Sequence, residues 1–180
     1  DLRTAVARAA GAWSAMGVAP GERVAIALAD GSTWVAAFLG AIRAGAVAVA
    51  LNPRLAPSDR DALAAEGAYS AWLGEDAAPA PAGVGAVLSR RAWRERCATA
   101  TPAAPVECAA GTPAFWLYSS GTTGLPKAVV HAHAVVPGAA RCGVEWLGIG
   151  ESDRLFAPSR LFFAYPLANS LFTGLASGAT

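Results

Sequence analysis

The sequence has few charged residues and no excess of either sign. Its 180 residues include 14 basic and 13 acidic side chains, which give a net charge of +1, and charged residues make up only 15%. Proteins that bind nucleic acid or anionic membranes present strongly basic surfaces, so this balance argues against both partners. The densest basic run, Ser89–Arg96, is interrupted by Trp93 and Glu95, and we expect it to form a short solvated helix.

Cysteine is also scarce. Cys97, Cys108 and Cys142 are odd in number and widely spaced, and no C-x-x-C pair occurs. This pattern argues against a disulfide framework and against a zinc site. We therefore expect no metal site in this chain, and a reducing, cytoplasmic location.

Targeting and membrane-spanning segments are missing from the pattern as well. Asp1 is not followed by a basic stretch and an apolar core, so we expect no signal peptide. The nearest candidate for a membrane span is Trp34–Leu51, but Arg43 and Gly45 interrupt it. A helix that ends at a glycine and leads into a strand explains this stretch better, and we expect no membrane association.

What the chain does contain is hydrophobic residues, at 54%, in alternating helical and strand-like runs. Apolar runs rich in valine and isoleucine are typical of strands buried on both faces. We expect Ser32 or Thr33 to cap the second helix and Ser58 to cap the third. The predicted helices are 2–16, 32–43 and 58–67, and the predicted strands are 23–29, 46–51, 68–73, 84–88 and 114–118. This alternation predicts an α/β fold with a largely parallel sheet flanked by helices.

The stretch Tyr118–Lys127, YSSGTTGLPK, follows the last of these strands. Ligands of open α/β sheets bind beyond the carboxyl ends of strands. Glycines bring backbone N–H groups close to an anion, hydroxyls add donors, and a lysine adds charge. Residue types and position therefore point to phosphate binding, with a polar connecting loop as the alternative. The candidate phosphate ligands are Ser119, Ser120, Gly121, Thr122, Thr123, Gly124 and Lys127.

This loop is not a Walker loop. That motif needs a glycine directly before the lysine and a hydroxyl directly after it, but Pro126 and Ala128 occupy those positions. The valines of Ala128–His133 favour a strand rather than a helix, so we expect the loop to join two strands. His131 and His133 would then share a face. Two histidines alone make a poor metal site, and packing or a loop hydrogen bond is the preferred interpretation.

The motif resembles the phosphate-loop signature of the adenylate-forming enzymes, which include acyl- and aryl-CoA synthetases, non-ribosomal adenylation domains and luciferases. The early segments GVAPGERVAIAL and FLGAIRAGAVAVALNPRL are similar to the first part of that family's large domain. Arg160–Thr180, RLFFAYPLANSLFTGLASGAT, is similar to the segment that forms part of the aryl-acid pocket in benzoate-CoA ligases. The sequence thus most resembles the benzoate and aryl-CoA ligases.

The resemblance implies an acid–thiol ligase. ATP would activate a carboxylic acid, expected to be aryl, as an acyl-adenylate, and a thiol of CoA or of a carrier protein's phosphopantetheine arm would then accept the acyl group. Phe163, Ala164 and Tyr165 would line the acid pocket. Magnesium would be required, with its ligands mostly outside this chain.

The resemblance also implies that the chain is an N-terminal part of a longer enzyme. Residues 1–112 would be part of a first βαβ-type subdomain, and residues 113–180 would carry the phosphate-loop strand and begin a second. The small domain with the catalytic lysine would lie beyond them, so we expect no catalytic residue here and no activity from residues 1–180 alone. A truncated sheet would expose apolar surface and favour self-association.

Several positions depart from the family pattern. Ala128, Pro166 and Ala168 stand where glycines are usual, and Arg160 replaces a lysine. These departures leave open a non-catalytic adenylation-like module that only binds or scaffolds. We expect a strand over 154–159, a strand end near Arg160 and a helix that has Pro166 in its first turn, where the missing N–H has no partner to lose.

Overall fold

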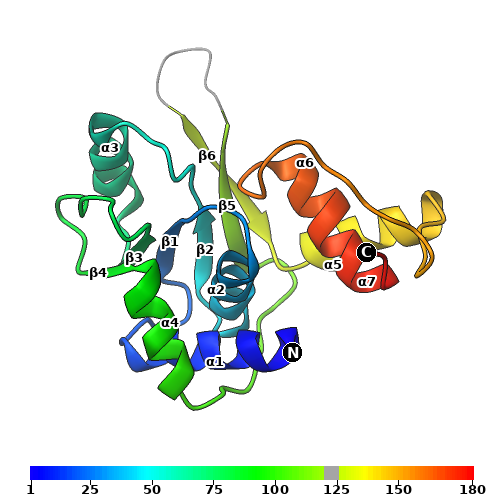
Figure 1. Cartoon of the computed structure of the whole chain (residues 1–180), viewed down its shortest axis with the longest axis horizontal. Coiled ribbons are helices and arrows are strands. Elements are labelled where there is room, and N and C mark those ends of the chain that lie inside the picture. Colours follow the sequence, from blue (N-terminus) through cyan, green and yellow to red (C-terminus); the bar gives the residue numbers. More distant parts are fainter. Residues whose placement is uncertain (120–125) are drawn as a thin grey trace. The chain divides into compact units, whose positions relative to one another are not determined.

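The structure, a computed structural model, describes residues 1–119 and 126–180 (Figure 1). The chain divides into two compact units, Asp1–Glu107 with Ala114–Trp116, and Cys108–Pro113 with Leu117–Thr180. Strand β5 (Pro113–Ser119) contributes residues to both units. The other elements of the first unit are helices α1 (Leu2–Ala15), α2 (Ser32–Arg43), α3 (Pro57–Gly67) and α4 (Arg90–Thr99) and strands β1 (Arg23–Ala27), β2 (Val47–Ala50), β3 (Ala71–Gly74) and β4 (Ala86–Ser89).

The sheet is largely parallel, as the sequence predicts. Strand β1 pairs in parallel with β2 and with β3, and β3 pairs in parallel with β4. In this register Val24 lies opposite Ala48 on one side and Ala71 on the other. The strand order is β4-β3-β1-β2-β5-β6, where β6 is Lys127–Ala132. Parallel strands need long crossover connections, and α2 and α3 lie in two of these. Strands β3 and β4 are joined by residues 75–85 without a helix.

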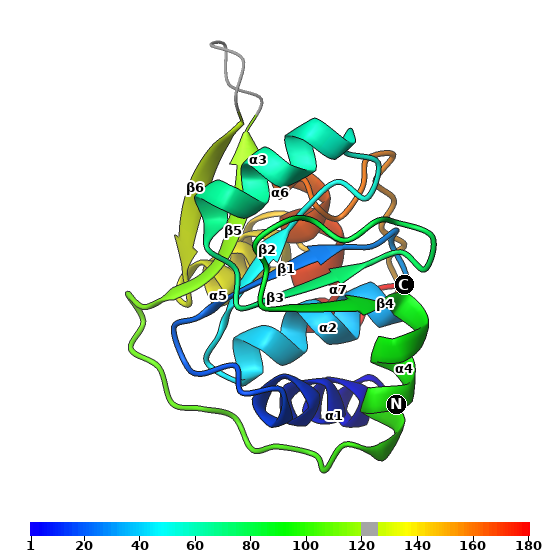
Figure 2. The same ribbon diagram turned by 90° about the vertical axis from the view of Figure 1, so that its left-hand side faces the viewer.

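The core of the first unit lies on both faces of this sheet. Figure 2 shows α2 against the sheet with α1 beyond it, and α3 on the opposite face. Every residue of β2 and β3 is buried, which explains their continuous apolar composition. Aromatic rings of α2 and β5 pack together in this core. Trp34 stacks on Phe38 with ring centroids 4.8 Å apart, and the centroids of Phe38 and Phe115 are 5.6 Å apart. Each large side chain buried in this way stabilises the fold by about 1.5–3 kcal/mol.

Helices α1 and α2 approach each other closely at Gly40. A Cβ atom at this position would lie 2.6 Å from the Cβ atom of Ala9 and 3.0 Å from the backbone nitrogen of Ala10. Real Cβ atoms do not come this near to another atom, so the packing of the two helices depends on the missing side chain. The alanines along the facing side of α1 serve the same close approach.

The helix caps differ from the prediction. Helix α2 begins at Ser32, and its N-cap residue is Gly31, which has no side chain to cap the helix. The prediction that Ser32 or Thr33 caps this helix is therefore wrong. Helix α3 begins at Pro57 rather than being capped by Ser58. Proline suits the first helical position because its ring fixes φ and the N–H that it lacks would be unpaired there.

The third strand starts later than predicted. Ala68 ends α3 in the left-handed conformation, with φ 44°, so β3 begins only at Ala71. The ring of Tyr69 packs over Gly67, where a Cβ atom would lie 2.0 Å from the ring carbon Cζ. The chain thus needs three residues to turn from the helix into the strand.

The second unit contains β6, helix α5 (Val135–Arg141) and the π-helix η1 (Cys142–Trp146). A further helical segment runs from Ala164 to Ser177 as α6 (Ala164–Pro166), the π-helix η2 (Leu167–Phe172) and α7 (Thr173–Ser177). Two predictions fail here. Residues 154–159 form no strand, and residues 160–163 form a turn rather than a strand end. Prolines and glycines on either side of this stretch favour turns over pairing.

Within the described residues, no helix combines the length and the apolar character that crossing a bilayer requires. The apolar stretch Trp34–Leu51 consists of most of α2 followed by β2, with Gly45 between them at φ 75°. The predicted change from helix to strand at this glycine is confirmed.

Candidate functional site

The glycine- and hydroxyl-rich loop joins two strands, as predicted. Ser119 is the last residue of β5 and Lys127 is the first residue of β6, and both are exposed. The hydroxyl of Ser119 donates a hydrogen bond to the backbone carbonyl of Lys127 over 3.4 Å. This long bond joins the last residue of β5 to the first residue of β6, so the two residues that bracket the loop lie side by side. The predicted ligands Ser120, Gly121, Thr122, Thr123 and Gly124 lie outside the described residues.

The strands that carry the loop are not equivalent. Strand β5 is anchored by buried Ala114, Phe115 and Leu117. No residue of strand β6 is fully buried. Neighbouring side chains point to opposite faces of a strand, yet Val129 and Val130 are 43% and 52% exposed. Exposure of both faces means that the described residues leave β6 largely uncovered. The strand that precedes the loop is therefore anchored in the core, and the strand that follows it is not.

The two histidines separate at the end of β6. His131 belongs to the strand, and burial lowers the pKa of its imidazole. His133 follows the last strand residue, and its backbone N–H donates to the carbonyl of Thr112 over 2.9 Å. The described residues contain no cluster of three or more side chains able to bind a metal ion.

The predicted acid-pocket residues are consecutive at the start of the second helical segment. Phe163 is the N-cap residue, and Ala164 and Tyr165 form the first turn. All three are exposed, Phe163 by 47% and Tyr165 by 61%. The ring of Phe163 lies against that of Phe162, with centroids 4.3 Å apart. In the part of the chain that the structure describes, these side chains lie on an open surface.

Pro166 occupies the first turn of this segment, as predicted, and is buried. Its lack of an N–H is harmless there because first-turn N–H groups have no partner within the helix. The N-cap Phe163 offers no side-chain acceptor to the N–H groups of Ala164 and Tyr165. The start of the segment therefore presents uncapped donors beside two exposed aromatic rings.

The wide turns of η2 are held by a contact that the sequence does not reveal. Thr173 is 2% exposed, and its hydroxyl donates to the carbonyl of Ala168 over 3.1 Å. Gly143 of η1 packs directly on it, because a Cβ atom at position 143 would lie 2.2 Å from Cγ2 of Thr173. Single π-helical turns are frequent at functional sites. Here one of them directly follows Pro166.

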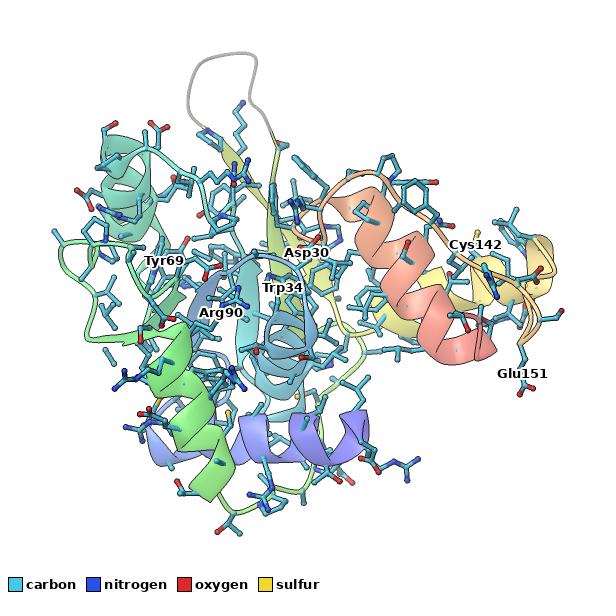
Figure 3. All side chains as sticks on the ribbon, in the orientation of Figure 1. Asp30, Trp34, Tyr69, Arg90, Cys142 and Glu151 are labelled. Atoms are coloured by element: carbon cyan, nitrogen blue, oxygen red, sulfur yellow. The ribbon has the colours of Figure 1, made fainter. Side chains whose placement is uncertain are left out.

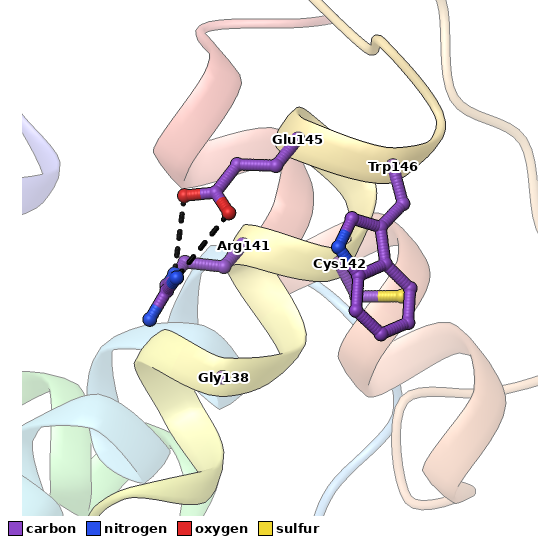
Figure 4. Close-up of a pocket in the computed structure, with 5 residues that line it drawn as sticks. All are labelled: Gly138, Arg141, Cys142, Glu145 and Trp146. Atoms are coloured by element: carbon purple, nitrogen blue, oxygen red, sulfur yellow. Dashed lines mark hydrogen bonds and ion pairs between the residues drawn. The ribbon is translucent and has the colours of Figure 1, made fainter.

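A hollow of about 250 Å³ lies on the continuous helix formed by α5 and η1. Figure 4 shows the residues that line it. Arg141 donates two hydrogen bonds to Glu145, at 3.1 and 3.3 Å, and these raise the pKa of the guanidinium. Cys142 and Trp146 complete the hollow, and Trp146 is 82% exposed. Since the two charges neutralise each other, the hollow offers a mainly apolar surface.

A charged bridge at the carboxyl ends of β1, β3 and β4 also escaped the sequence analysis. Glu75 accepts bonds from Nε and Nη2 of Arg90, at 2.9 and 2.7 Å, and from the backbone N–H of Ala29 at 2.6 Å. The hydrogen bonds from Arg90 are the main reason why the pKa of Glu75 lies below its ordinary value. Figure 3 shows Arg90 at the start of α4, where it ties this helix to the sheet. No local sequence pattern marks this pairing.

The fold places the chain among α/β proteins with a largely parallel sheet and helices on both faces. Residues 1–180 match the family described as AMP-binding enzyme, and the chain belongs to that family. The predicted resemblance is thus confirmed over the whole length.

Individual relatives agree. The chain is 40% identical to a 3-hydroxybenzoate–CoA ligase of Aromatoleum sp. (strain CIB), an alignment that covers all of this chain and 38% of that protein. A crystal structure of a benzoate CoA ligase from Burkholderia xenovorans LB400 superimposes with a TM-score of 0.88 at 33% identity, over 100% of this chain and 38% of the other. The anthranilate CoA ligase AuaEII in complex with anthranoyl-AMP gives a TM-score of 0.88 at 26% identity, over 99% and 37%. The chain therefore spans well under half the length of these relatives.

Proposed function

We propose that the full-length protein is an ATP-dependent, AMP-forming ligase that joins an aryl carboxylic acid to a thiol. A carboxylate oxygen attacks the α-phosphorus of ATP, pyrophosphate leaves, and an aryl-adenylate forms. A thiol then attacks the acyl carbon and releases AMP. The observation that carries the proposal is the YSSGTTGLPK loop between β5 and β6. The chain that contains it belongs to the AMP-binding enzyme family, and its relatives include a 3-hydroxybenzoate–CoA ligase and a benzoate CoA ligase.

The loop is proposed to hold the β- and γ-phosphates and the departing pyrophosphate. Ser119 and Lys127 flank it, and Ser120, Gly121, Thr122, Thr123 and Gly124 lie between them. Fixed donors stabilise charge that develops on a leaving group most effectively when they are positioned in advance. The bond from Ser119 to the Lys127 carbonyl supports such positioning because it closes the base of the loop. A magnesium ion would neutralise phosphate charge, with ligands mostly beyond Thr180.

The acid is proposed to bind at Phe163, Ala164 and Tyr165. The rings of Phe163 and Tyr165 are exposed and offer a flat aromatic ligand two faces to stack on. Ala164 leaves room between them. A carboxylate is also favoured at the uncapped start of a helix, where N–H groups and the helix dipole attract negative charge. This support concerns the acid's chemical class and not its ring substituents.

We also infer the subdomains, the acyl acceptor and the location of the protein. Residues 1–112 and 113–180 are portions of two successive subdomains. The acceptor is CoA or the phosphopantetheine arm of a carrier protein, and the protein acts in the cytoplasm. The uncovered strand β6 supports self-association of residues 1–180 when they are expressed alone.

The test is acid-dependent pyrophosphate exchange by the full-length enzyme, with benzoate, octanoate and acetate. Lys127→Ala should abolish most of the exchange, while Arg154→Ala, a change of another exposed cation, should leave it intact. Tyr165→Ala should reduce the preference for benzoate about threefold to tenfold, because aromatic stacking contributes about 0.5–1.5 kcal/mol. Leu175→Ala, a control on the same helical segment, should not.

The outcomes separate the competing hypotheses. Absence of exchange with all three acids would support the non-catalytic binding or scaffold module. Exchange that prefers octanoate, and that Tyr165→Ala does not change, would remove the aryl assignment while keeping adenylation.

A further inference from the structure

Helices α1, α2 and α4 line an open hollow of about 280 Å³ in the first unit. Ala5 and Arg8 come from α1, Ser32 from the start of α2, and Trp93, Arg94 and Cys97 from α4. These residues are up to 92 positions apart in the chain, from Ala5 to Cys97. No step of the proposed function uses them.

The floor of the hollow is aromatic and rigid. Trp93 is 1% exposed, and its ring lies 4.1 Å from that of Trp13. Trp13 is fixed in turn, because its indole N–H donates to the carbonyl of Ala37 over 3.1 Å. The buried indole pair therefore gives the hollow a base that does not have to move when a ligand enters.

The rim of the hollow is cationic. Arg8 and Arg94 line it, and no aspartate or glutamate does. Arg8 already donates to the carbonyl of Ala98 over 2.6 Å. Arg94 makes no hydrogen bond or ion pair with the described part of the chain. Arg94 also lines an adjoining hollow that contains Asp76 and Glu95. Both of these acids are bound to Arg91, Asp76 through its backbone N–H and Glu95 through its guanidinium.

We propose that this hollow is a second binding site, for a small aromatic anion with one ring and one carboxylate or sulfonate. The ring would lie among Ala5, Ala36 and Cys97 above the buried Trp93, and the anionic group would pair with Arg94, with Ser32 as a further donor. Cavities of about 150 Å³ already accept benzene, and drug-sized ligands need about 300–1,000 Å³, so the volume suits a single substituted ring. The site does not depend on the adenylation chemistry, since the loop and residues 163–165 take no part.

The first test is a ¹⁹F NMR titration of residues 1–180 with 4-fluorobenzenesulfonate, an anion that cannot be adenylated. Saturable binding is expected, with neutral 4-fluorobenzyl alcohol at least tenfold weaker. Arg94→Gln should weaken binding about tenfold, the effect of losing one hydrogen bond to a charged group. Arg96→Gln removes the same charge from an exposed position of the same helix outside the hollow and should leave binding within twofold.

A second readout locates the probe. Burial raises the pKa of the Cys97 thiol to about 11, so it reacts slowly with maleimides, and bound probe should slow it further. The exposed Cys142 is the internal control and should react at an unchanged rate. Ala5→Leu, which fills the hollow from its half-buried edge, should abolish both effects.

Three results would overturn the proposal. They are equal binding of the sulfonate and the alcohol, wild-type affinity in Arg94→Gln, and equal protection of Cys97 and Cys142. If Ala5→Leu does not fold, the Arg94→Gln and Arg96→Gln pair still decides the question, because both positions are exposed.

Discussion

The contact between α1 and α2 makes Gly40 an informative glycine to test in the first unit. In an exposed helix, replacing glycine by alanine stabilises by about 1 kcal/mol, because alanine has the higher helix propensity. At Gly40 the new methyl group would lie 2.6 Å from the Cβ atom of Ala9 and 3.0 Å from the backbone nitrogen of Ala10. These atoms belong to the body of a helix and cannot rotate away.

The expected change in the free energy of unfolding is the balance of overpacking against helix propensity. Forcing an extra methyl group into a packed interface costs about 1–3 kcal/mol, and more when backbone must shift. This exceeds the gain in propensity, so Gly40→Ala should lower the free energy of unfolding by about 1–2 kcal/mol. Gly138→Ala is the matched control: Gly138 lies in α5, nothing lies within 4 Å of its added Cβ, and the change should be neutral or stabilising.

The assay is urea denaturation followed by circular dichroism, with hydrogen exchange of the α1 and α2 amides to locate the effect. Gly40→Ala should accelerate exchange in these two helices first. Equal or greater stability of Gly40→Ala, or a loss of the same size in Gly138→Ala, would refute the close approach of α1 and α2.

Three further predictions concern charge, the second unit and the chain as a whole. The pKa of Glu75 is lowered chiefly by Arg90, so its stabilisation is present above the ordinary carboxyl pKa and is lost as the pH falls through the lowered value. Denaturation at several pH values should show Glu75→Gln about 1 kcal/mol less stable at pH 7 and equal to wild type near pH 2; a constant difference would contradict this. Gly143→Ala should destabilise the second unit, and Thr173→Ala should relieve part of this, with a coupling energy of about 1 kcal/mol in a double-mutant cycle; additivity would argue against the contact. Residues 1–180 alone should catalyse no acid-dependent pyrophosphate exchange.

The sequence predicted the sheet well because buried parallel strands are short apolar runs, as β1 and β2 are. It failed where backbone geometry outweighs residue preference. Ser32 and Ser58 are good capping residues, yet both lie inside helices that begin with other N-caps. Likewise the contact between Trp13 and Trp93 joins residues far apart in the chain, so no local pattern could reveal it.

The candidate site was predictable only in part. The loop at the end of β5 follows from its composition and its position after a buried strand. The bridge between Glu75 and Arg90 depends on strand order, which a single sequence does not encode locally. The packing of Gly143 on Thr173, beside the π-helical turns, depends on close approach of two helices.

The most direct test of the proposed adenylation uses the full-length enzyme with benzoate and ATP but without a thiol. Mass spectrometry should detect benzoyl-AMP and pyrophosphate in equal amounts, both dependent on the acid, and added CoA should convert the adenylate into benzoyl-CoA and AMP. Lys127→Ala should suppress the first step. Release of ADP and phosphate, or AMP formation that does not depend on any acid, would contradict the assignment.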